Sequence, residues 1–333
     1  MPWKFEKDPY KIWLSEIILQ QTRVEQGLSY YNKFVKKYPT IKKLAAAKET
    51  DVFKLWEGLG YYSRCKNLLA TAKLIAHDWE GNFPDKYEDI LKLKGVGPYT
   101  AAAIASFAYN LPHAVVDGNV MRVLARFFGV DTPIDSTEGK KLFAQLSFQL
   151  LKKDQAAIYN QAIMDFGATV CKPQLPQCAD CILSSKCVAL ATDTIDTLPI
   201  KTKKLIKKNR WFIYIVASYK GNYYLRRRNE KDIWQNLHEF IAIEASKKTT
   251  VDELVQLDKF KQIMGTNSTI VHVSEVYKQA LTHQTIFAYF IHVQLKKAPP
   301  LQGFEAVDIQ TVKKLAFPKL IAQYLKDNKG RFK

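Results

Sequence analysis

The sequence predicts two domains of different class, an all-α domain over residues 1–190 and an α+β domain over residues 211–333. In the first domain, apolar side chains recur every three or four positions, as they do on the buried face of a helix. Alternation of apolar and polar residues, the pattern of a half-buried strand, is almost absent before residue 190 and begins at Trp211. Between them, residues 191–210 combine Thr, Asp and Pro with a run of lysines, which predicts a linker that could lie along DNA.

The helical spacing of apolar residues and the alternation typical of strands also predict the individual elements. In the first domain they predict helical segments at residues 10–36, on both sides of a break at 58–64 within 41–78, at 120–128, and within 137–170. In the second domain they predict strands near residues 211–216, 223–228, 240–243, 271–273 and 286–293, and helices at 250–264 and 308–326. We therefore expect a bundle of helices followed by a sheet that helices flank.

The composition favours a folded protein that binds a polyanion. Apolar residues make up 47% of the chain, which supports real cores and argues against disorder. No apolar run is long enough for a transmembrane helix and the N-terminus has no signal core, so we expect an intracellular protein. The net charge of +18 suits nucleic acid or an anionic membrane. Nucleic acid is favoured because no long basic amphipathic helix stands out, although a merely soluble basic surface carries the same charge.

The stretch from Gly95 to Asn119 carries the strongest local signals. Gly95-Val-Gly-Pro-Tyr99 follows an apolar segment and precedes an Ala-rich one, which predicts a helix, a tight turn and a helix. The uncovered N–H groups of such a turn can hold a phosphate of a nucleic acid strand. Asp117 would place a negative carboxylate near the bound phosphate. The two negative charges repel, so the arrangement is unfavourable unless the carboxylate takes part in a reaction. The alternative is a helix–turn–helix in which Asp117 only caps a helix.

Two other segments carry candidate functional side chains. Glu16 has apolar neighbours on its helix, so it is either a partly buried acid or, like most glutamates, a solvated one. The loop Gly58-Leu-Gly-Tyr-Tyr-Ser-Arg64 could touch nucleic acid, with Tyr61 or Tyr62 stacked on bases and Arg64 on a phosphate. It could instead be a helix–helix turn whose tyrosines pack on the core.

Four of the five cysteines lie within seventeen residues, in a C-x6-C-x2-C-x5-C pattern that runs from Cys171 through Cys178 and Cys181 to Cys187. No secretion signal accompanies them, so metal ligation is favoured over disulfides. Four thiolates in a compact loop, with no His nearby, suit either tetrahedral zinc or an iron–sulfur cubane. The sequence thus predicts a metal site and gives Cys65 no role.

These motifs together resemble a known family. Leu93-Lys-Gly-Val-Gly-Pro-Tyr-Thr100 with Val116-Asp-Gly-Asn-Val120 is similar to the helix–hairpin–helix DNA glycosylases, and the cysteine loop is similar to that of their iron–sulfur branch, which includes endonuclease III. Trp13-Leu-Ser-Glu-Ile-Ile-Leu-Gln-Gln-Thr22 and the 58–64 loop resemble the MutY-type adenine DNA glycosylases, and the resemblance covers nearly the whole chain. It implies a six-helix barrel with a [4Fe-4S] cluster on the four cysteines and a Nudix-like lesion-recognition domain. It also implies a monomer in the bacterial cytoplasm, associated with the nucleoid.

The resemblance implies base-excision repair of adenine mispaired with 8-oxoguanine or guanine in duplex DNA, by flipping the adenine out and hydrolysing its glycosidic bond. Glu16 matches the general acid that protonates adenine at N7, with a pKa raised by surroundings of low polarity. Asp117 matches the ionised carboxylate that stabilises the positive sugar. Tyr99 and Asn119 match residues that orient this pair. Endonuclease III-type enzymes carry a Lys in place of Tyr99, so little or no strand cleavage is expected.

The resemblance also implies contacts with DNA. Gln21 and Tyr61 would wedge into the gap left by the flipped base. The hairpin glycines would offer amides to a phosphate, with a monovalent or divalent cation on the hairpin carbonyls. The residues implied to contact DNA in this domain are Gln21, Thr22, Tyr61, Arg64, Gly95 and Gly97.

The second domain and the N-terminus depart from the family pattern. No Gly-x5-Glu-x7-Arg-Glu box is present, so pyrophosphate hydrolysis is not expected. The family's Phe-Ser-His element, which checks for 8-oxoguanine, corresponds to Leu281-Thr282-His283, a tripeptide that could otherwise be a core strand. The chain begins almost at Pro2-Trp3, and Lys4 stands where an Arg or Gln often lies near the adenine pocket.

Two alternative functions remain open. One is an endonuclease III-like lyase that acts on oxidised pyrimidines. The other is a non-catalytic iron–sulfur protein that binds DNA or senses redox state. It would need the basic surface and the cysteines but not Glu16 or Asp117.

Overall fold

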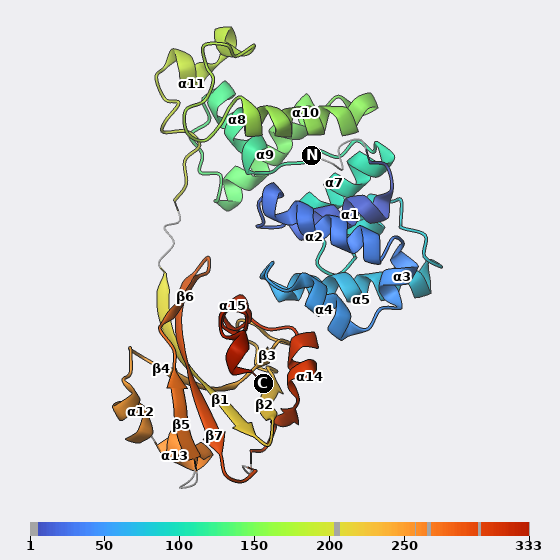
Figure 1. Cartoon of the computed structure of the whole chain (residues 1–333). Helices are drawn as coiled ribbons and strands as arrows, with labels where there is room; N and C mark the ends of the chain where they lie inside the picture. Colours follow the sequence, from blue (N-terminus) through green and yellow to red (C-terminus); the bar gives the residue numbers. More distant parts are fainter. Residues whose placement is uncertain (1–5, 203–206, 257, 265–267, 299–300, 333) are drawn as a thin grey trace. The chain divides into compact units, whose positions relative to one another are not determined.

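The computed structural model describes residues 6–202, 207–256, 258–264, 268–298 and 301–332. The expectations for Pro2-Trp3 and Lys4 therefore lie outside the described residues. The chain forms two compact units (Figure 1), which we call the helical unit (Met1–Ala46 and Asn67–Lys204) and the sheet unit (Ala47–Lys66 and Leu205–Lys333). Each is described by itself. Among the described residues we find no helix with the length and apolarity needed to cross a membrane.

The helical unit is all-α in its described residues, as the sequence predicts. Helix α5 (Tyr62–Asp78) begins in the sheet unit and continues into the helical unit. The other helices of the unit are α1 (Pro9–Leu19), α2 (Val24–Lys37), α3 (Ile41–Ala45), α6 (Tyr87–Leu91), α7 (Pro98–Tyr109), α8 (Gly118–Phe128), α9 (Thr137–Leu150), α10 (Ala156–Thr169) and α11 (Val188–Ala191), with 3-10 turns at Lys153–Gln155 and Ser184–Lys186.

The helical pattern over residues 10–36 is interrupted once. Helix α1 ends at Leu19 and α2 begins at Val24. Between them Gln21 has φ of 54°, a left-handed conformation that cannot continue a right-handed helix. The interruption leaves Gln21 exposed on a turn of its own.

Helix α7 is central to the helical unit. Ala101, Ala103 and Ala105 have no exposed surface, and their small side chains let α1, α6 and α10 pack closely against it. On α1, Trp13 and Leu14 are also fully buried, and each such side chain contributes roughly 1.5–3 kcal/mol of burial free energy. The helix that carries Glu16 is therefore packed firmly against the helix that carries Tyr99.

The sheet unit contains one mixed sheet, in the order β3-β2-β1-β7-β5, with β4 paired to β1, β6 to β7 and β8 to β2. The two long strands β1 and β7 are parallel, and the other pairs are antiparallel. The strands are β1 (Lys208–Tyr219), β2 (Asn222–Arg227), β3 (His238–Glu239), β4 (Ile241–Ala245), β5 (Ser268–Val273), β6 (Tyr277–Ala280), β7 (Gln284–Leu295) and β8 (Glu305–Val307).

Helices cover both faces of this sheet (Figure 1). On one face α12 (Val251–Gln256) and α13 (Asp258–Met264) bury Leu254 and Phe260 against the strands. On the other face lie α14 (Ile309–Lys314) and α15 (Lys319–Asp327), and the α15 residue Tyr324 stacks on Phe290 with ring centroids 3.7 Å apart. The predicted α+β class is confirmed.

A short part of the N-terminal half packs with the sheet unit. Helix α4 (Glu49–Trp56) carries Lys54, whose Nζ donates to the Leu315 carbonyl at 2.8 Å. The Phe317 N–H donates to the Glu57 carboxylate at 2.9 Å. These two bonds hold α4 against the connection between α14 and α15.

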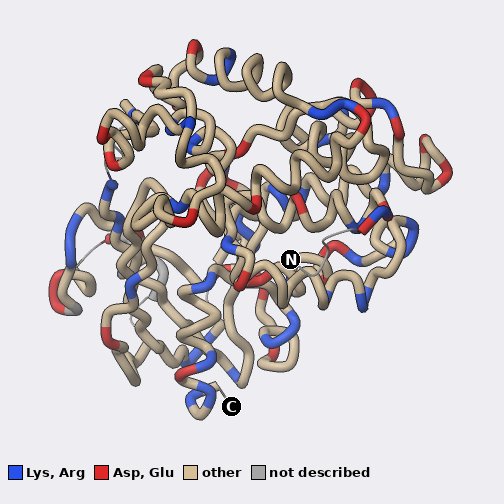
Figure 2. The backbone as a smooth tube through the Cα atoms, turned by 90° about the horizontal axis from the view of Figure 1, so that it is seen from above, with Lys and Arg blue, Asp and Glu red and all other residues tan. Residues whose placement is uncertain are grey.

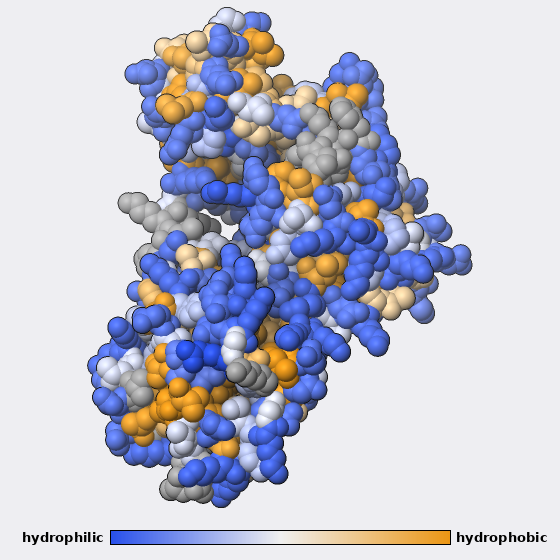
Figure 3. All heavy atoms as spheres, in the orientation of Figure 1, coloured by the Kyte–Doolittle hydropathy of each residue, from blue (hydrophilic) through white to orange (hydrophobic). Residues whose placement is uncertain are grey.

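The surface is rich in cationic residues. Lys and Arg positions are spread over the helices and loops of both units rather than confined to one element (Figure 2). Apolar surface is also present, including at the end of the helical unit that carries α11 (Figure 3), where Leu175 is 88% exposed and Ile182 86% exposed.

Candidate active site

Glu16 is a buried acid rather than a solvated one. It lies in the middle of α1, is 8% exposed, and is surrounded by the apolar side chains of its own helix. Burial raises the pKa of its carboxyl group to about 7, and the nearby charge of Asp117 adds to the rise. A hydrogen bond from the Tyr99 hydroxyl acts in the opposite direction and lowers the pKa. Near neutral pH, Glu16 can therefore hold a proton and also release it.

Asp117 has a different environment, at the N-terminus of α8. One carboxylate oxygen accepts from the backbone N–H groups of Asn119 and Val120, each at 2.8 Å. The other oxygen accepts from the Asn119 side-chain amide at 2.8 Å. Three donors and the positive end of a helix dipole favour a negative charge on this group. Asp117 does cap a helix, as the alternative interpretation predicts, but it is also close to Glu16.

Tyr99 joins the two acids. Its hydroxyl is hydrogen bonded to Glu16, and burial together with the charges of Glu16 and Asp117 raises the pKa of the phenol well above its usual value. The structure thus brings Glu16, Tyr99, Asp117 and Asn119 together in the helical unit. A pocket beside Glu16 is lined by α1, α7 and α10 and by Glu6 and Lys7, which precede α1. Its apolar lining residues include Phe107 and Met164.

Two buried arginines on α8 connect this group to the cysteine loop. Arg122 donates from Nη2 to the Asn119 side-chain oxygen at 2.8 Å and from Nε to the Cys171 carbonyl at 2.8 Å. Arg126, 2% exposed, donates to the carbonyls of Lys172 and Leu198 at 2.7 and 3.0 Å. Sequence reasoning missed both residues, although two arginines one helical turn apart in an apolar helix were a usable signal.

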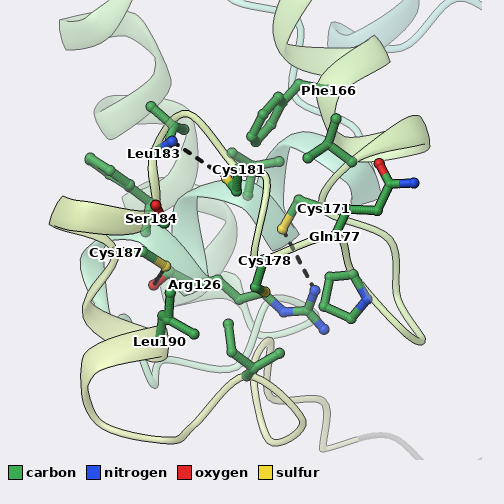
Figure 4. Close-up of a pocket in the computed structure, with 15 residues that line it drawn as sticks. Arg126, Phe166, Cys171, Gln177, Cys178, Cys181, Leu183, Ser184, Cys187 and Leu190 are labelled. Atoms are coloured by element: carbon green, nitrogen blue, oxygen red, sulfur yellow. Dashed lines mark hydrogen bonds between the residues drawn. The ribbon is translucent and has the colours of Figure 1, made fainter.

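The four predicted cysteine ligands face one pocket (Figure 4). Arg126 Nη1 lies 3.6 Å from the Cys171 sulfur, and the Leu183 N–H donates to the Cys181 sulfur at 3.4 Å. Burial, and then the charges of the other three thiols, raise the pKa of Cys178, so the four sulfurs lie within electrostatic range of one another. Among the described residues, however, no three His, Cys, Asp or Glu side chains are arranged to hold a single metal ion.

The hairpin glycines keep their backbone open. Gly95 has φ of 81°, and a Cβ there would also lie 3.0 Å from Asn67, so another residue would be strained and crowded. Gly97 precedes α7, and nothing lies within 4 Å of where its Cβ would be. The amide of Gln20 donates to the Gly95 carbonyl at 3.4 Å, which links the hairpin to the end of α1. In the turn after α1, Gln21 is exposed and the Thr22 hydroxyl donates to the Gln20 carbonyl at 3.4 Å.

The other predicted contact residues lie in the sheet unit. Tyr61 is 41% exposed with φ of 46°, and its hydroxyl is hydrogen bonded to Thr282. Thr282 and His283 are exposed in the turn between β6 and β7, so this tripeptide is not a core strand. Loop 58–63 and this turn line one cleft, to which Lys66 and Lys319 also contribute.

The Arg64 side chain, expected to contact a phosphate, is buried against its own loop in this structure. It is 8% exposed, and its guanidinium donates to the Gly60 carbonyl at 3.3 Å and lies over the rings of Trp56 and Tyr61. Burial lowers its pKa to about 10. In this structure Arg64 shapes the loop, and its contact with a phosphate stays a prediction.

Comparison with known proteins identifies the family. Residues 14–147 match the model of the HhH-GPD superfamily base excision DNA repair proteins, and residues 212–327 match a NUDIX domain. The adenine DNA glycosylase of Buchnera aphidicola subsp. Acyrthosiphon pisum is 36% identical over 85% of this chain and 80% of that protein. The one from Buchnera aphidicola subsp. Baizongia pistaciae is 33% identical over 89% of this chain and 82% of that protein. This chain belongs to the adenine DNA glycosylase family.

Members of the adenine DNA glycosylase family are hydrolases of N-glycosyl bonds, and the fold agrees with that class. A solved structure described as a thermostable thymine-DNA glycosylase superposes with a TM-score of 0.53 at 30% identity, over 58% of this chain and 88% of that one. The HhH-GPD match contains Glu16, Tyr99 and Asp117, whereas the four cysteines follow it. The NUDIX match contains Thr282 and His283.

Proposed function

We propose that this protein removes adenine paired with 8-oxoguanine or guanine in duplex DNA, by hydrolysis and with little or no strand cleavage. The observation that carries the proposal is the pair of acids with opposite environments. Glu16 is buried among apolar side chains, and Asp117 is surrounded by N–H donors. Such a pair can supply a proton and a negative charge to the same reaction at the same pH.

In the proposed mechanism the adenine leaves the base stack, because a stacked base is out of reach, and enters the pocket beside Glu16. Glu16 donates its proton to N7 of the base, so that adenine leaves as a neutral molecule. Asp117 stabilises the positive charge that develops on the sugar as the glycosidic bond breaks. Water then adds to the sugar and completes the hydrolysis.

Two neighbours would orient these acids. The Tyr99 hydroxyl is hydrogen bonded to Glu16, and the Asn119 amide to Asp117. A phenol at position 99 cannot form the Schiff base through which a lysine cuts the strand, which favours a monofunctional glycosylase. This argues against the lyase alternative, and the pairing of Glu16 with Asp117 argues against a protein that only binds DNA.

The DNA itself would be held by backbone and side-chain groups in both units. Gly95 and Gly97 present open amides at the start of α7 for a phosphate, and a cation could bind the hairpin carbonyls. Gln21 and Tyr61 are both exposed with left-handed backbones, which suits residues that reach into a gap between bases, and Thr22 lies beside Gln21. We propose that the chain acts on DNA as a monomer.

Recognition of 8-oxoguanine is assigned to the cleft in the sheet unit. There the Thr282 hydroxyl is hydrogen bonded to Tyr61 and lies on an exposed turn with His283. Because one such hydrogen bond contributes about 0.5–1.5 kcal/mol, Thr282→Ala should reduce the preference for 8-oxoguanine over guanine by roughly two- to tenfold.

We further propose that Cys171, Cys178, Cys181 and Cys187 hold a [4Fe-4S] cluster. The donor set is four thiols with N–H groups directed at two of the sulfurs, which suits such a cluster. The cluster would stabilise the loop, and no step of hydrolysis passes through it. Purified protein should be yellow-brown and contain iron and sulfide; a colourless protein with one zinc per chain would contradict the assignment.

The decisive experiment is a single-turnover assay on a duplex with adenine opposite 8-oxoguanine. Adenine should be released, and strands should break only after alkali cleaves the abasic site. A matched duplex with thymine glycol tests the lyase alternative. Strand breaks without alkali on either duplex, or no adenine release, would contradict the proposed function.

A further inference from the structure

The segment that leads into Asp117 is held by one buried side chain. Between α7 and α8, residues 111–117 run without helix or strand, so the backbone groups there lack regular partners. Asn160 of α10, 2% exposed, fills this role. Its side-chain oxygen accepts from the Val115 N–H at 3.0 Å, and its amide donates to the His113 carbonyl at 2.9 Å.

The same side chain also reaches α7. The second N–H of the Asn160 amide donates to the hydroxyl of Ser106, a fully buried residue of α7, at 2.8 Å. One amide therefore connects α7, α10 and the segment two residues before Asp117. Both of its donors and its carbonyl are used, so no apolar side chain of the same shape could replace it without leaving buried groups unpaired.

The packing around this amide includes the candidate active site. Val115, 1% exposed, packs in a cluster with Ala102 and Ala103 of α7, and Tyr99 and Met164 lie against that cluster. A shift of the segment would therefore displace both Tyr99 and the first turn of α8.

Asp117 is fixed only partly by its own helix. The bonds from Asn119 and Val120 set the direction of the carboxylate relative to α8. They do not set where the first turn of α8 lies relative to α7, on which Tyr99 sits. That distance depends on the 111–117 segment, which Asn160 ties to α7 and α10. It also depends on the direct packing of α8 against α10, where Arg122 donates to the Gly167 carbonyl at 2.7 Å.

We infer that Asn160 is a positioning residue for the reaction, which holds the 113–115 segment so that Asp117 reaches the sugar of the flipped nucleotide. The inference rests on the proposed function, since it assumes that Asp117 acts on that sugar. Misplacement of a reacting group by about 1 Å can cost on the order of 100-fold in rate. We expect Asn160→Leu to release adenine about 10- to 100-fold more slowly in single turnover, with the Kd for the mispaired duplex unchanged within about twofold.

The matched control is Ser106→Ala, which removes the α7 partner of the same amide but leaves both bonds to the segment; its rate should stay within about threefold of wild type. Asn160→Ala is the second variant, because its smaller side chain lets water reach Val115 and His113 if the leucine prevents folding. Both are assayed well below their melting temperatures.

A double variant separates positioning from general damage. Asn119→Ala should also slow release through Asp117, so Asn160→Ala combined with it should lose less than the product of the two single effects. If the rate loss of the double variant equals the product of the two single losses, the two substitutions act independently, and the inference is overturned. If the wild-type chain releases no adenine, the proposed function fails and the inference fails with it. If wild type is active and Asn160→Ala is equally active, the inference alone is overturned.

Discussion

Glu16 and Asp117 are the same functional group in two opposite settings. Glu16 lies inside a helix, 8% exposed, where burial raises its pKa to about 7 and the Tyr99 hydroxyl is hydrogen bonded to it. Asp117 lies at the start of a helix, where two backbone N–H groups and one amide surround it. The difference shows how a chain separates an acid from a stabilising anion with local structure alone, since mid-helix burial favours the protonated form and a helix N-terminus favours the charged one.

The largest expected effect comes from removing either the proton of Glu16 or the negative charge of Asp117. Glu16→Gln and Asp117→Asn keep the shape of each side chain but remove its proton or its charge, and each should slow adenine release by about 10³-fold or more. Single-turnover kinetics on the adenine:8-oxoguanine duplex measures this, with DNA binding followed separately.

A matched control exists for the second of these variants. Asp308 also caps a helix, accepting from the Thr311 N–H at the start of α14 in the sheet unit. Asp308→Asn should leave the rate unchanged, since it removes a capping charge but no reacting group. Equal losses for Asp117→Asn and Asp308→Asn would show that capping, not chemistry, explains the effect.

The pH dependence tests the state of Glu16 directly. The acid must be protonated to react, and its pKa is about 7, so the rate should be highest below that pH. Above it the rate should fall tenfold per pH unit, to about one hundredth at pH 9. The measurement is a single-turnover profile from pH 6 to 9, with duplex binding checked at each pH. A flat profile would remove Glu16 as the proton donor.

The same burial should cost stability at high pH. In the unfolded chain Glu16 loses its proton near its ordinary pKa of 4.5, but in the folded chain it does so near 7. Between these values the folded state holds the extra proton, so its stability falls by about 1.4 kcal/mol per pH unit, about 3 kcal/mol in all. Glu16→Gln has no ionisable group at this position, so it does not lose stability in this way as the pH rises.

The stability of Glu16→Gln relative to wild type should therefore be up to about 3 kcal/mol greater at pH 8 than at pH 5. Glu25→Gln, which replaces an exposed acid on α2, should show no such difference. Urea denaturation of the helical unit at both pH values measures the difference. A variant that is no more stable than wild type at pH 8 would show that Glu16 is better solvated than its burial indicates.

The sequence was informative where the signal is local. The apolar neighbours of Glu16 left a buried acid as one of two possibilities, and the cap at Asp117 was likewise one of two. The alternation after Trp211 predicted the sheet, and the structure shows all three features. The break at Gln21 was not seen because its left-handed φ leaves no mark in the apolar pattern.

Long-range connections could not be predicted in the same way. Asn160 bonds to groups 45 to 54 positions away, and Arg122 to a carbonyl 49 positions away, so no window of sequence contains both partners. Arg64 shows that a local pattern does not fix the direction of a side chain, and its contact with a phosphate stays a prediction. Its place beside tyrosines and glycines predicted a DNA contact, yet its guanidinium folds back on its own loop.

The smallest expected effect concerns the Tyr99 hydroxyl, which is hydrogen bonded to the Glu16 carboxyl group. The Tyr99 hydroxyl lowers the pKa of Glu16, since it stabilises the carboxylate form, so Tyr99→Phe should raise that pKa further. The midpoint of the rate profile should move to higher pH by roughly half a unit to one unit, while the pH-independent rate falls as Glu16 loses its orientation. The comparison of the two acids requires this direction. A midpoint that moves below that of wild type would mean that the Tyr99 hydroxyl stabilises the protonated form of Glu16 rather than the carboxylate.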